Sequence, residues 1–323
     1  MSEKIVEEGI NVEKVLIYHE IFTEIGTCLE DMVSIEILQP EDKSDFEREL
    51  PSADFLIISV DWEDRFLDLA EQLKWIQSIS AGFDMFPLER IIEDGVRFST
   101  ASGIHRIGAS EHVMGLILSL ARNLHIARDA QREKYWARDR LIRPGQAGGK
   151  TLGIVGLGEI GSAVAEKAKY FEMEVLGVKR DTSTHTEFVD ELYPPEEVAE
   201  VLSRSDFLLL ACPLTSETKG WFGLKQFELM QDHAYLINIA RGEVVVEDEL
   251  VEALEQNAIA GAGLDVFETE PLSPQSRLWD FENVIITPHY GGANENHSQK
   301  IAELFAENYR RYRKGKRLKN EIR

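Results

Sequence analysis

The sequence predicts an α/β protein of two domains, each built around a mainly parallel β-sheet, with one domain inserted into the other. Three observations predict this fold. The chain has 323 residues, which exceeds the roughly 250–300 residues at which a single hydrophobic core stops growing. Short apolar segments alternate with helix-compatible segments along its length. A glycine-rich turn opens a second α/β series in mid-chain, so the second domain begins well inside the sequence.

The first hundred residues predict a flavodoxin-like domain. Their apolar segments have the length and composition of strands, and polar segments typical of helices lie between them. The predicted strands are 14–20, 34–38, 54–60, 74–80 and 96–100, and two of the predicted helices are 42–50 and 62–73. Residues 109–125 predict a long buried helix, with Ser110 in its first turn, that is suited to pack between the domains.

The second series predicts a doubly wound, Rossmann-like nucleotide-binding domain. Its six predicted strands lie in 150–155, 174–180, 205–212, 234–240, 259–267 and 283–289. One basic-ended helix, 298–316, follows the sixth strand, and we expect it to return to the first domain. The predicted division is therefore 1–102 with 292–323 for the substrate domain and 103–291 for the dinucleotide-binding domain.

Composition excludes several classes of protein. The excess of acidic over basic residues is 58 − 35 = 23, which disfavours nucleic-acid binding and suggests, as a hypothesis, a halophilic source. No apolar run is long enough for a membrane span, and the polar start does not resemble a secretory signal, so we expect a cytoplasmic protein. Cys28 and Cys212 have no metal-ligand spacing, which predicts two free thiols and no metal site.

The segment "GLGEIG" predicts a pyrophosphate-binding turn. It contains Gly156, Gly158 and Gly161 in the G-x-G-x-x-G spacing, with Glu159 and Ile160 between the last two, and it joins a predicted strand to a predicted helix. In that context the first glycine permits a tight turn, the second lets the backbone approach the phosphates, and the third allows close packing of helix on strand. We therefore expect a nicotinamide dinucleotide here.

The residues at the end of the next predicted strand indicate which dinucleotide the protein binds. An NAD-binding fold usually places a carboxylate there, about 20 residues after the loop, to accept from the ribose hydroxyls. Here Lys179 and Arg180 occupy that place, and they are suited to a 2′-phosphate, which favours NADP(H). Asp181 leaves NAD(H) open, because its carboxylate could turn toward a ribose.

Three residues that follow predicted strands of the second domain predict the chemistry. Arg241, Glu270 and His289 should converge, because the carboxyl ends of parallel strands face a common crevice. With "SAGFD", "ASEH" and the glycine loop in the same order, the chain resembles the D-isomer-specific 2-hydroxyacid dehydrogenase family over nearly its full length.

The chemistry of a 2-oxo acid assigns roles to these residues. Arg241 supplies a two-pronged cation for the carboxylate and carbonyl oxygen. His289 exchanges the proton, while Glu270 orients it and favours its charged form. The resemblance further implies that the amides of Ala81 and Gly82 bind the substrate carboxylate from the other domain. It also implies cofactor contacts from Cys212, Pro213, Ile239, Ala240, Asp265, His289 and Gly291, with a buried core cysteine as the alternative for Cys212.

Three further residues have weaker signals. His112 is interpreted as structural, because a histidine on a helix usually packs or hydrogen-bonds. Arg106 is a surface cation by default, although it lies near the predicted hinge and could reach the substrate. Trp136 resembles a tryptophan that closes the partner subunit's site in glyoxylate and hydroxypyruvate reductases.

The predicted function is reduction of small 2-oxo acids to D-2-hydroxy acids by a homodimer that prefers NADPH. An NAD-linked oxidation of a D-2-hydroxy acid is the alternative on the same fold. A nucleotide-sensing binding protein, like the corepressors related to this family, is an alternative from another class. The sequence leaves the side chain of the substrate open.

Overall fold

The computed structural model describes residues 12–18, 24–30, 35–58, 62–139, 144–183 and 186–323. The chain forms two compact units, residues 1–104 with 294–323 and residues 105–293. Both crossings lie two residues beyond the sequence-based positions. Ile104 packs against the core of the first unit, whereas His105 Nδ1 lies 2.9 Å from the carbonyl oxygen of Gly292 within the second. The chain therefore changes unit between residues 104 and 105.

The sheet of the first unit has six strands in the order β13-β5-β4-β3-β1-β2. Strands β1 to β5 are parallel and follow the flavodoxin order, and β13 joins the edge antiparallel to β5. Each of the five predicted segments contains a strand; predicted positions 19–20, 34 and 59–60 lie outside the described residues, and β13 was not predicted. The strands are β1 (Lys14–Tyr18), β2 (Glu36–Leu38), β3 (Phe55–Ile58), β4 (Trp75–Ser78), β5 (Arg97–Ser99) and β13 (Glu321–Ile322).

Helices cover both faces of this sheet. Alternate strand residues point to opposite faces, so each face has its own apolar cluster. One cluster includes α1 (Glu24–Glu30) and α11 (His297–Arg313), and Phe305 of α11 stacks on Trp75 at 4.6 Å between ring centres. The other includes α2 (Lys43–Glu49), α3 (Phe66–Leu69) and α4 (Leu88–Glu93). The C-terminal helix therefore returns to the first unit, as expected from the sequence.

The sheet of the second unit has seven parallel strands in the order β12-β11-β10-β9-β6-β7-β8. This is the doubly wound order with one further strand beside β11. All six predicted strands are present, and β8 was missed. The strands are β6 (Thr151–Val155), β7 (Glu174–Val178), β8 (Glu191–Tyr193), β9 (Phe207–Leu210), β10 (Tyr235–Asn238), β11 (Gly261–Leu264) and β12 (Val284–Ile286).

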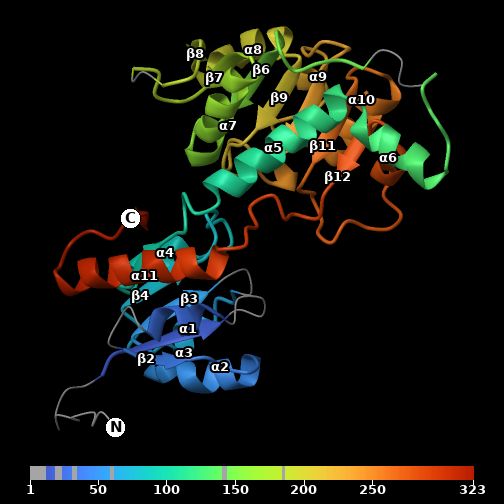
Figure 1. The fold of residues 1–323 in the computed structure, drawn as a ribbon. Coiled ribbons are helices and arrows are strands. Elements are labelled where there is room, and N and C mark those ends of the chain that lie inside the picture. The colour runs from blue at the N-terminus through green and yellow to red at the C-terminus, as the bar shows by residue number, and fades with distance from the viewer. Residues whose placement is uncertain (1–11, 19–23, 31–34, 59–61, 140–143, 184–185) are drawn as a thin grey trace. The chain divides into compact units, whose positions relative to one another are not determined.

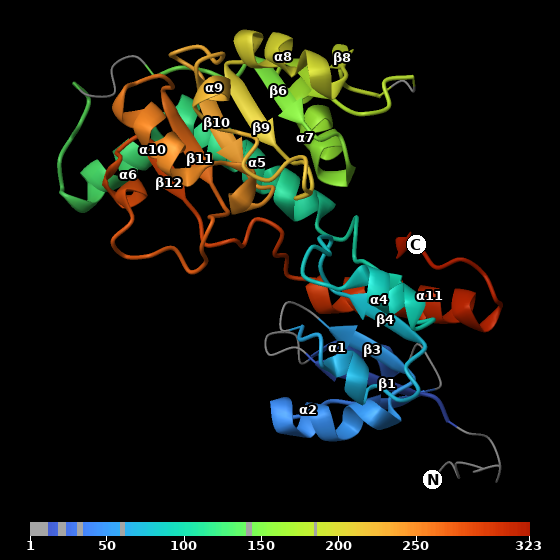
Figure 2. The same cartoon turned by 180° about the vertical axis from the view of Figure 1, so that it is seen from behind.

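Two apolar clusters fill the two faces of the second sheet. One includes α5 (Arg106–Ala121) and α7 (Glu159–Tyr170), and α5 lies in front of the sheet in Figure 1 and behind it in Figure 2. The opposite face carries α8 (Val198–Arg204), α9 (Leu224–Phe227) and α10 (Glu247–Glu255). Because the central strands are covered on both faces, their sequences are mostly apolar rather than alternating, whereas the edge strand β8 is partly polar.

Two predicted helices differ from the structure. Residues 62–73 contain only the four-residue helix α3. The helix expected over 109–125 begins at Arg106 and ends at Ala121, so Ser110 lies in its second turn. Asn123 then adopts a left-handed conformation, with φ of 53°, and a separate helix α6 (Leu124–Arg132) follows. A left-handed residue cannot continue a right-handed helix, which explains the break.

Neither unit contains, among the described residues, a helix long and apolar enough to cross a membrane. Cys28 and Cys212 are both free thiols, as predicted, and both are half-buried. No three His, Cys, Asp or Glu side chains in the described part of the chain gather closely enough to hold a metal ion.

Candidate active site

The three glycines of the loop between β6 and α7 lie in three different environments. Gly156 has φ of +104°, and a Cβ there would lie 2.7 Å from the backbone of Ala211 and Cys212. A Cβ on Gly158 would meet no protein atom within 4 Å, which leaves room for a ligand at the N-terminus of α7. A Cβ on Gly161 would overlap the carbonyl oxygen of Gly156. These environments match the tight turn, the open approach and the close packing that a pyrophosphate loop requires.

A pocket of about 320 Å³ lies at this loop, entirely within the second unit. Most of its lining residues are apolar, and Lys179 and Arg180 line it at the end of β7, which suits the adenosine half of a dinucleotide. Glu159 and Ile160 begin α7 beside it. The lining residues are Val155, Gly156, Leu157, Gly158, Val178, Lys179, Arg180, Pro195, Val198, Cys212, Pro213, Thr215, Glu217, Thr218 and Trp221.

Lys179 and Arg180 lie where the sequence places them, directly after β7 and in the wall of this pocket. The Lys179 amide donates to the carbonyl oxygen of Tyr193 at 3.0 Å, which fixes the backbone of the turn. Asp181 accepts from the amide of Ser183 at 3.0 Å and from its hydroxyl at 2.5 Å. These bonds, with the nearby charge of Lys179, lower the pKa of Asp181. Its carboxylate is therefore ionised and engaged within its own turn.

Cys212 and Pro213 follow β9 and line the same pocket. Burial raises the pKa of the Cys212 thiol above its ordinary value. A raised pKa keeps the side chain in the neutral thiol form at neutral pH, because the thiolate is the form that burial disfavours. Cys212 therefore contributes an apolar wall rather than a charge.

His289 and Glu270 form a hydrogen-bonded pair. His289 Nδ1 donates to Glu270 Oε2 at 2.7 Å, and the other carboxylate oxygen, Oε1, accepts from the amide of Phe267 at 3.0 Å. The carboxylate is thus fixed at both ends. With Nδ1 occupied, Nε2 is the ring atom that can exchange a proton. The His289 side chain is 47% exposed, which leaves the ring accessible to a substrate.

Arg241 follows β10, the strand next to β11 in the sheet. It is half-buried, and its Nη1 donates to the carbonyl oxygen of Ala240 at 2.8 Å. The preceding residues Ile239 and Ala240 form the turn between strand and arginine, and Asn238 Oδ1 accepts from the Ala240 amide at 3.1 Å. Arg241, Glu270 and His289 therefore follow the neighbouring strands β10, β11 and β12 at the same edge of one sheet.

Asp265 is buried and fixes the turn that carries His289. Its Oδ1 accepts from the Thr287 hydroxyl at 2.6 Å and from the Tyr290 amide at 3.2 Å, and its Oδ2 accepts from the Gly291 amide at 2.9 Å. His289 has φ of 50°, an uncommon conformation for a non-glycine residue that surrounding contacts must hold. The family resemblance implied that Asp265 contacts the cofactor. In the structure, Asp265 also accepts hydrogen bonds that stabilise the turn carrying His289.

His112 is part of the same network and has structural partners, as interpreted from the sequence. Its Nε2 lies 3.0 Å from the Thr287 hydroxyl and 3.5 Å from Asp265, and its ring packs edge-on against Tyr290. Sequence reasoning missed Thr287 and Tyr290. The only available signal was their position beside His289 after an apolar strand.

The remaining predicted residues belong to other segments of the chain. Ala81 and Gly82 are in the loop after β4, in the first unit. Arg106 forms an ion pair with Glu166 of α7 at 3.0 Å, which agrees with the default interpretation as a surface cation. Trp136 is 86% exposed.

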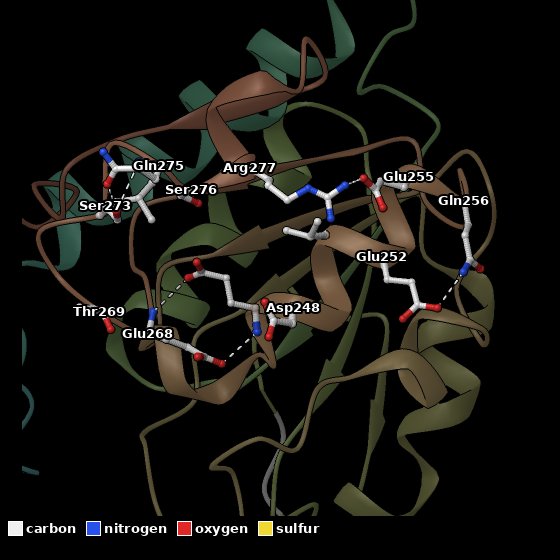
Figure 3. Close-up of a pocket in the computed structure, with 13 residues that line it drawn as sticks. Asp248, Glu252, Glu255, Gln256, Glu268, Thr269, Ser273, Gln275, Ser276 and Arg277 are labelled. Atoms are coloured by element: carbon white, nitrogen blue, oxygen red, sulfur yellow. Dashed lines mark hydrogen bonds and ion pairs between the residues drawn. The ribbon is translucent and has the colours of Figure 1, made fainter.

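A further pocket in the second unit contains none of the predicted site residues. It measures about 870 Å³ and lies between α10 and the loop of residues 268–277 (Figure 3). Its wall is strongly acidic, with one arginine, Arg277, paired to Glu255. Burial and the charges of Glu268 and Asp248 raise the pKa of Glu247, although a hydrogen bond from the Glu268 amide opposes them. An anionic substrate and a pyrophosphate would both be repelled here, so we do not assign the reaction to this pocket.

Comparison with known proteins agrees with this geometry. Residues 114–291 match the family described as "D-isomer specific 2-hydroxyacid dehydrogenase, NAD binding domain". A glyoxylate reductase from Thermofilum pendens is 36% identical over 246 residues, which are 75% of this chain and 72% of that protein.

Solved structures are similar over almost the whole chain. A D-isomer specific 2-hydroxyacid dehydrogenase family protein from Aeromonas salmonicida has a TM-score of 0.85 and 29% identity, covering 96% of this chain and 99% of that one. An NADPH-dependent glyoxylate/hydroxypyruvate reductase from Sinorhizobium meliloti, solved with NADP and sulfate, has a TM-score of 0.83 and 27% identity, with coverages of 96% and 98%. The chain belongs to the D-isomer specific 2-hydroxyacid dehydrogenase family and has its nicotinamide-dinucleotide-binding domain.

Proposed function

We propose that the protein reduces small 2-oxo acids to D-2-hydroxy acids and prefers NADPH. One observation carries the chemical part of this proposal. The 2.7 Å hydrogen bond between His289 Nδ1 and Glu270 Oε2 lies at the sheet edge that also carries Arg241. A fixed acid–base pair beside a cation is what a 2-oxo acid needs, because its carboxylate must be held while its carbonyl oxygen gains a proton.

Arg241, His289 and Glu270 have different roles in the proposed reaction. The guanidinium of Arg241 binds the carboxylate and carbonyl oxygen of the substrate through two parallel donors. His289 Nε2 gives its proton to the carbonyl oxygen during reduction and takes it back in the reverse direction. Glu270 keeps the ring in the orientation that exposes Nε2 and stabilises the imidazolium. The bound nicotinamide supplies the hydride.

The resemblance to the family assigns the other residues that contact the substrate and the cofactor. The amides of Ala81 and Gly82, in the unit of residues 1–104 and 294–323, bind the substrate carboxylate, so this unit is the proposed substrate domain. The unit of residues 105–293 is the proposed dinucleotide-binding domain. Within it we place the cofactor against Gly156, Gly158, Glu159, Ile160, Gly161, Cys212, Pro213, Ile239, Ala240, Asp265, His289 and Gly291.

The preference for NADPH rests on the end of β7. Lys179 and Arg180 line the pocket at the glycine loop, where a 2′-phosphate would lie. Asp181, the carboxylate in the turn after β7 that could serve NAD instead, accepts from Ser183 within that turn. The Sinorhizobium meliloti reductase, which is similar over almost its whole length, is described as NADPH-dependent. These observations together favour NADP(H) over NAD(H).

A homodimer is the proposed assembly. Leu124, Tyr135 and Trp136 expose 53%, 44% and 86% of their surfaces in one stretch of the second unit. A pocket of about 460 Å³ lies beside Tyr135 and Trp136. Clustered exposed apolar side chains of this size indicate a protein contact. Light scattering on wild type and Trp136→Ala tests the assignment: the variant should shift from dimer toward monomer, and a monomeric wild type would contradict it.

The function itself is tested by turnover. Glyoxylate, pyruvate, hydroxypyruvate and branched 2-oxo acids are each offered with NADPH and with NADH, at low and at molar salt. At least one of them should consume NADPH with a higher kcat/KM than NADH. Consumption of NADH alone would support the NAD-linked alternative. Nucleotide binding without any turnover would support the sensor alternative and contradict the enzyme.

A further inference from the structure

The loop that carries Arg241 is packed directly on the loop that carries Glu270. A Cβ on Gly242, the residue after Arg241, would overlap the carbonyl carbon and oxygen of Phe267 and come within 2.3 Å of the Glu268 amide. A real Cβ essentially never approaches backbone so closely, so only glycine allows this contact. The two loops therefore meet backbone against backbone at this point.

A pair of reciprocal hydrogen bonds closes the same junction. Glu268 Oε1 accepts from the amide of Glu247 at 2.9 Å, and Glu247 Oε2 accepts from the amide of Glu268 at 3.3 Å. Figure 3 shows these two bonds at one end of the acidic pocket, between Glu268 and the start of α10. We call this arrangement the Glu247–Glu268 clasp. It ties the loop after β11 to the helix that follows the Arg241 loop.

The clasp also provides a hydrogen-bond acceptor for the N-terminus of α10. The residue before this helix is Val246, which has no side-chain oxygen and makes no side-chain capping bond. The first amides of a helix need an acceptor, and a carboxylate is favoured there by the helix dipole. Glu268 supplies that acceptor from a different loop. A local cap would serve the helix equally well, but it would not connect the two loops.

Two further hydrogen bonds link the clasp to the Glu270–His289 pair. The amide of Phe267, next to Glu268, donates to Glu270 Oε1 at 3.0 Å. Glu270 Oε2 then accepts from His289 Nδ1 at 2.7 Å. The position of the Phe267–Glu268 backbone therefore sets where the Glu270 carboxylate lies, and with it the orientation of the His289 ring.

We propose that Gly242 and the Glu247–Glu268 clasp are positioning elements that fix the Glu270–His289 pair relative to Arg241. None of these three residues is assigned contact with substrate or cofactor. They act through the backbone of Phe267 and Glu268, which the clasp holds against the Arg241 loop. Misplacing a catalytic group by about 1 Å can cost roughly a hundredfold in rate, so a clasp of this kind has a measurable consequence.

The inference rests on the proposed function, because it concerns the same three residues. Glu268→Ala removes the acceptor for the Glu247 amide. Glu268→Gln keeps an oxygen acceptor and removes only the charge. Glu252→Ala is the matched control, because Glu252 lies on α10 in the same acidic pocket and, within the described residues, its side chain bonds only to Gln256, at 2.8 Å. Gly242→Ala is the fourth variant.

Four quantities are measured on each variant: kcat with the best 2-oxo acid, KM for that acid, Kd for NADPH, and the ¹H–¹³C ring signals of His289. We expect Glu268→Ala to lower kcat by about tenfold to a hundredfold and to shift the His289 signals, with Kd for NADPH unchanged. Glu268→Gln should retain most of the rate, and Glu252→Ala should match wild type. If Gly242→Ala folds, its kcat should fall as that of Glu268→Ala does. The Glu268 variants test the positioning role whether or not Gly242→Ala folds.

Wild-type kcat and His289 signals in Glu268→Ala would overturn the proposal. So would equal losses in Glu268→Ala and Glu268→Gln, since the charge and not the hydrogen bond would then matter. If wild type turned over no 2-oxo acid, the proposed function would fail. The His289 signals would still report whether the clasp positions the pair.

Discussion

The glycine loop and the Arg241–Glu270–His289 group differ in how the chain builds them. The loop is made by adjacent residues, and its three glycines have local reasons for their identity: a positive φ, an open approach and a close helix–strand contact. The group is assembled from the ends of three strands, and the bond from His289 to Glu270 joins residues 19 positions apart, although Glu270 also accepts from the amide of Phe267 three positions away. The glycine loop can therefore be recognised from the local sequence, whereas the arrangement of the Arg241–Glu270–His289 group depends on packing between distant segments.

We therefore expect some substitutions to change the reaction rate and others to change cofactor binding. Replacement of His289 should have the largest effect. Replacement by alanine removes the proton donor but leaves the glycine loop unchanged. General acid catalysis is worth about a hundredfold to ten-thousandfold, so kcat should fall by that range. Steady-state assays from pH 5 to 9 check this. Near-normal activity of His289→Ala across that range would remove His289 from the mechanism.

Arg241→Lys should have the next largest effect, and it should affect both substrate affinity and rate. Lysine keeps the charge but cannot present two parallel donors to a carboxylate. Losing one charge-assisted hydrogen bond costs about 1.5–3 kcal/mol, or roughly tenfold to a hundredfold in kcat/KM. The measurement is kcat and KM for the best substrate, with Kd for NADPH as the control. A change in NADPH affinity alone would mean that Arg241 serves the cofactor.

The double variant Lys179→Ala/Arg180→Ala tests the cofactor side of the comparison. Loss of the two cations should raise KM for NADPH by at least about tenfold, because each charge-assisted contact to the phosphate is worth about 1.5–3 kcal/mol before screening. KM for NADH should change little, since NADH has no 2′-phosphate. Equal losses for both cofactors would mean that the cations only shape the turn, and NAD would then be the leading candidate.

Cys212 gives a pH-dependent test of the same pocket. Its raised pKa means that the reactive thiolate is scarce at pH 7 and becomes abundant only above the ordinary range for cysteine. Alkylation of a Cys28→Ser variant should therefore be slower than that of an unhindered thiol and should accelerate as pH rises. Saturating NADPH should slow it further, because Cys212 lines the pocket. Identical rates with and without NADPH would place the cofactor elsewhere.

The smallest effect concerns the whole surface rather than either region. With 23 excess negative charges, self-repulsion is strongest in dilute buffer and is screened as salt increases. The melting temperature should rise from dilute to molar salt, with a gain of 1 kcal/mol corresponding to about 2–4 °C for a domain of 150–250 residues. Calorimetry over that range is the measurement. A falling melting temperature would contradict the hypothesis of a halophilic source.

The fold could be predicted where the signal is local. Both sheets were predicted because buried parallel strands are short continuous apolar runs. Strands β8 and β13 were missed, because "ELY" and "EI" are too short and polar to differ from loops. The break after Ala121 was also missed, since it depends on the left-handed conformation of Asn123.

The site could be predicted only in part for the same reason. Residue identities after strand ends indicated Arg241, Glu270 and His289. The contacts that support the His289 turn could not be predicted, because His112 and Thr287, for example, are separated by 175 positions and meet only in the folded chain. The close approach of Gly242 to Phe267 likewise has no signature in the sequence.

The most direct test of the separation between binding and chemistry is one stopped-flow experiment on two variants. NADPH binding and the oxidation of bound NADPH by a saturating 2-oxo acid are both measured in His289→Ala and in Lys179→Ala/Arg180→Ala. His289→Ala should bind NADPH like wild type and oxidise it at least about a hundredfold more slowly. The double variant should bind NADPH weakly and, once saturated, oxidise it at the wild-type rate. Slow oxidation in both variants, or weak binding in both, would contradict this account.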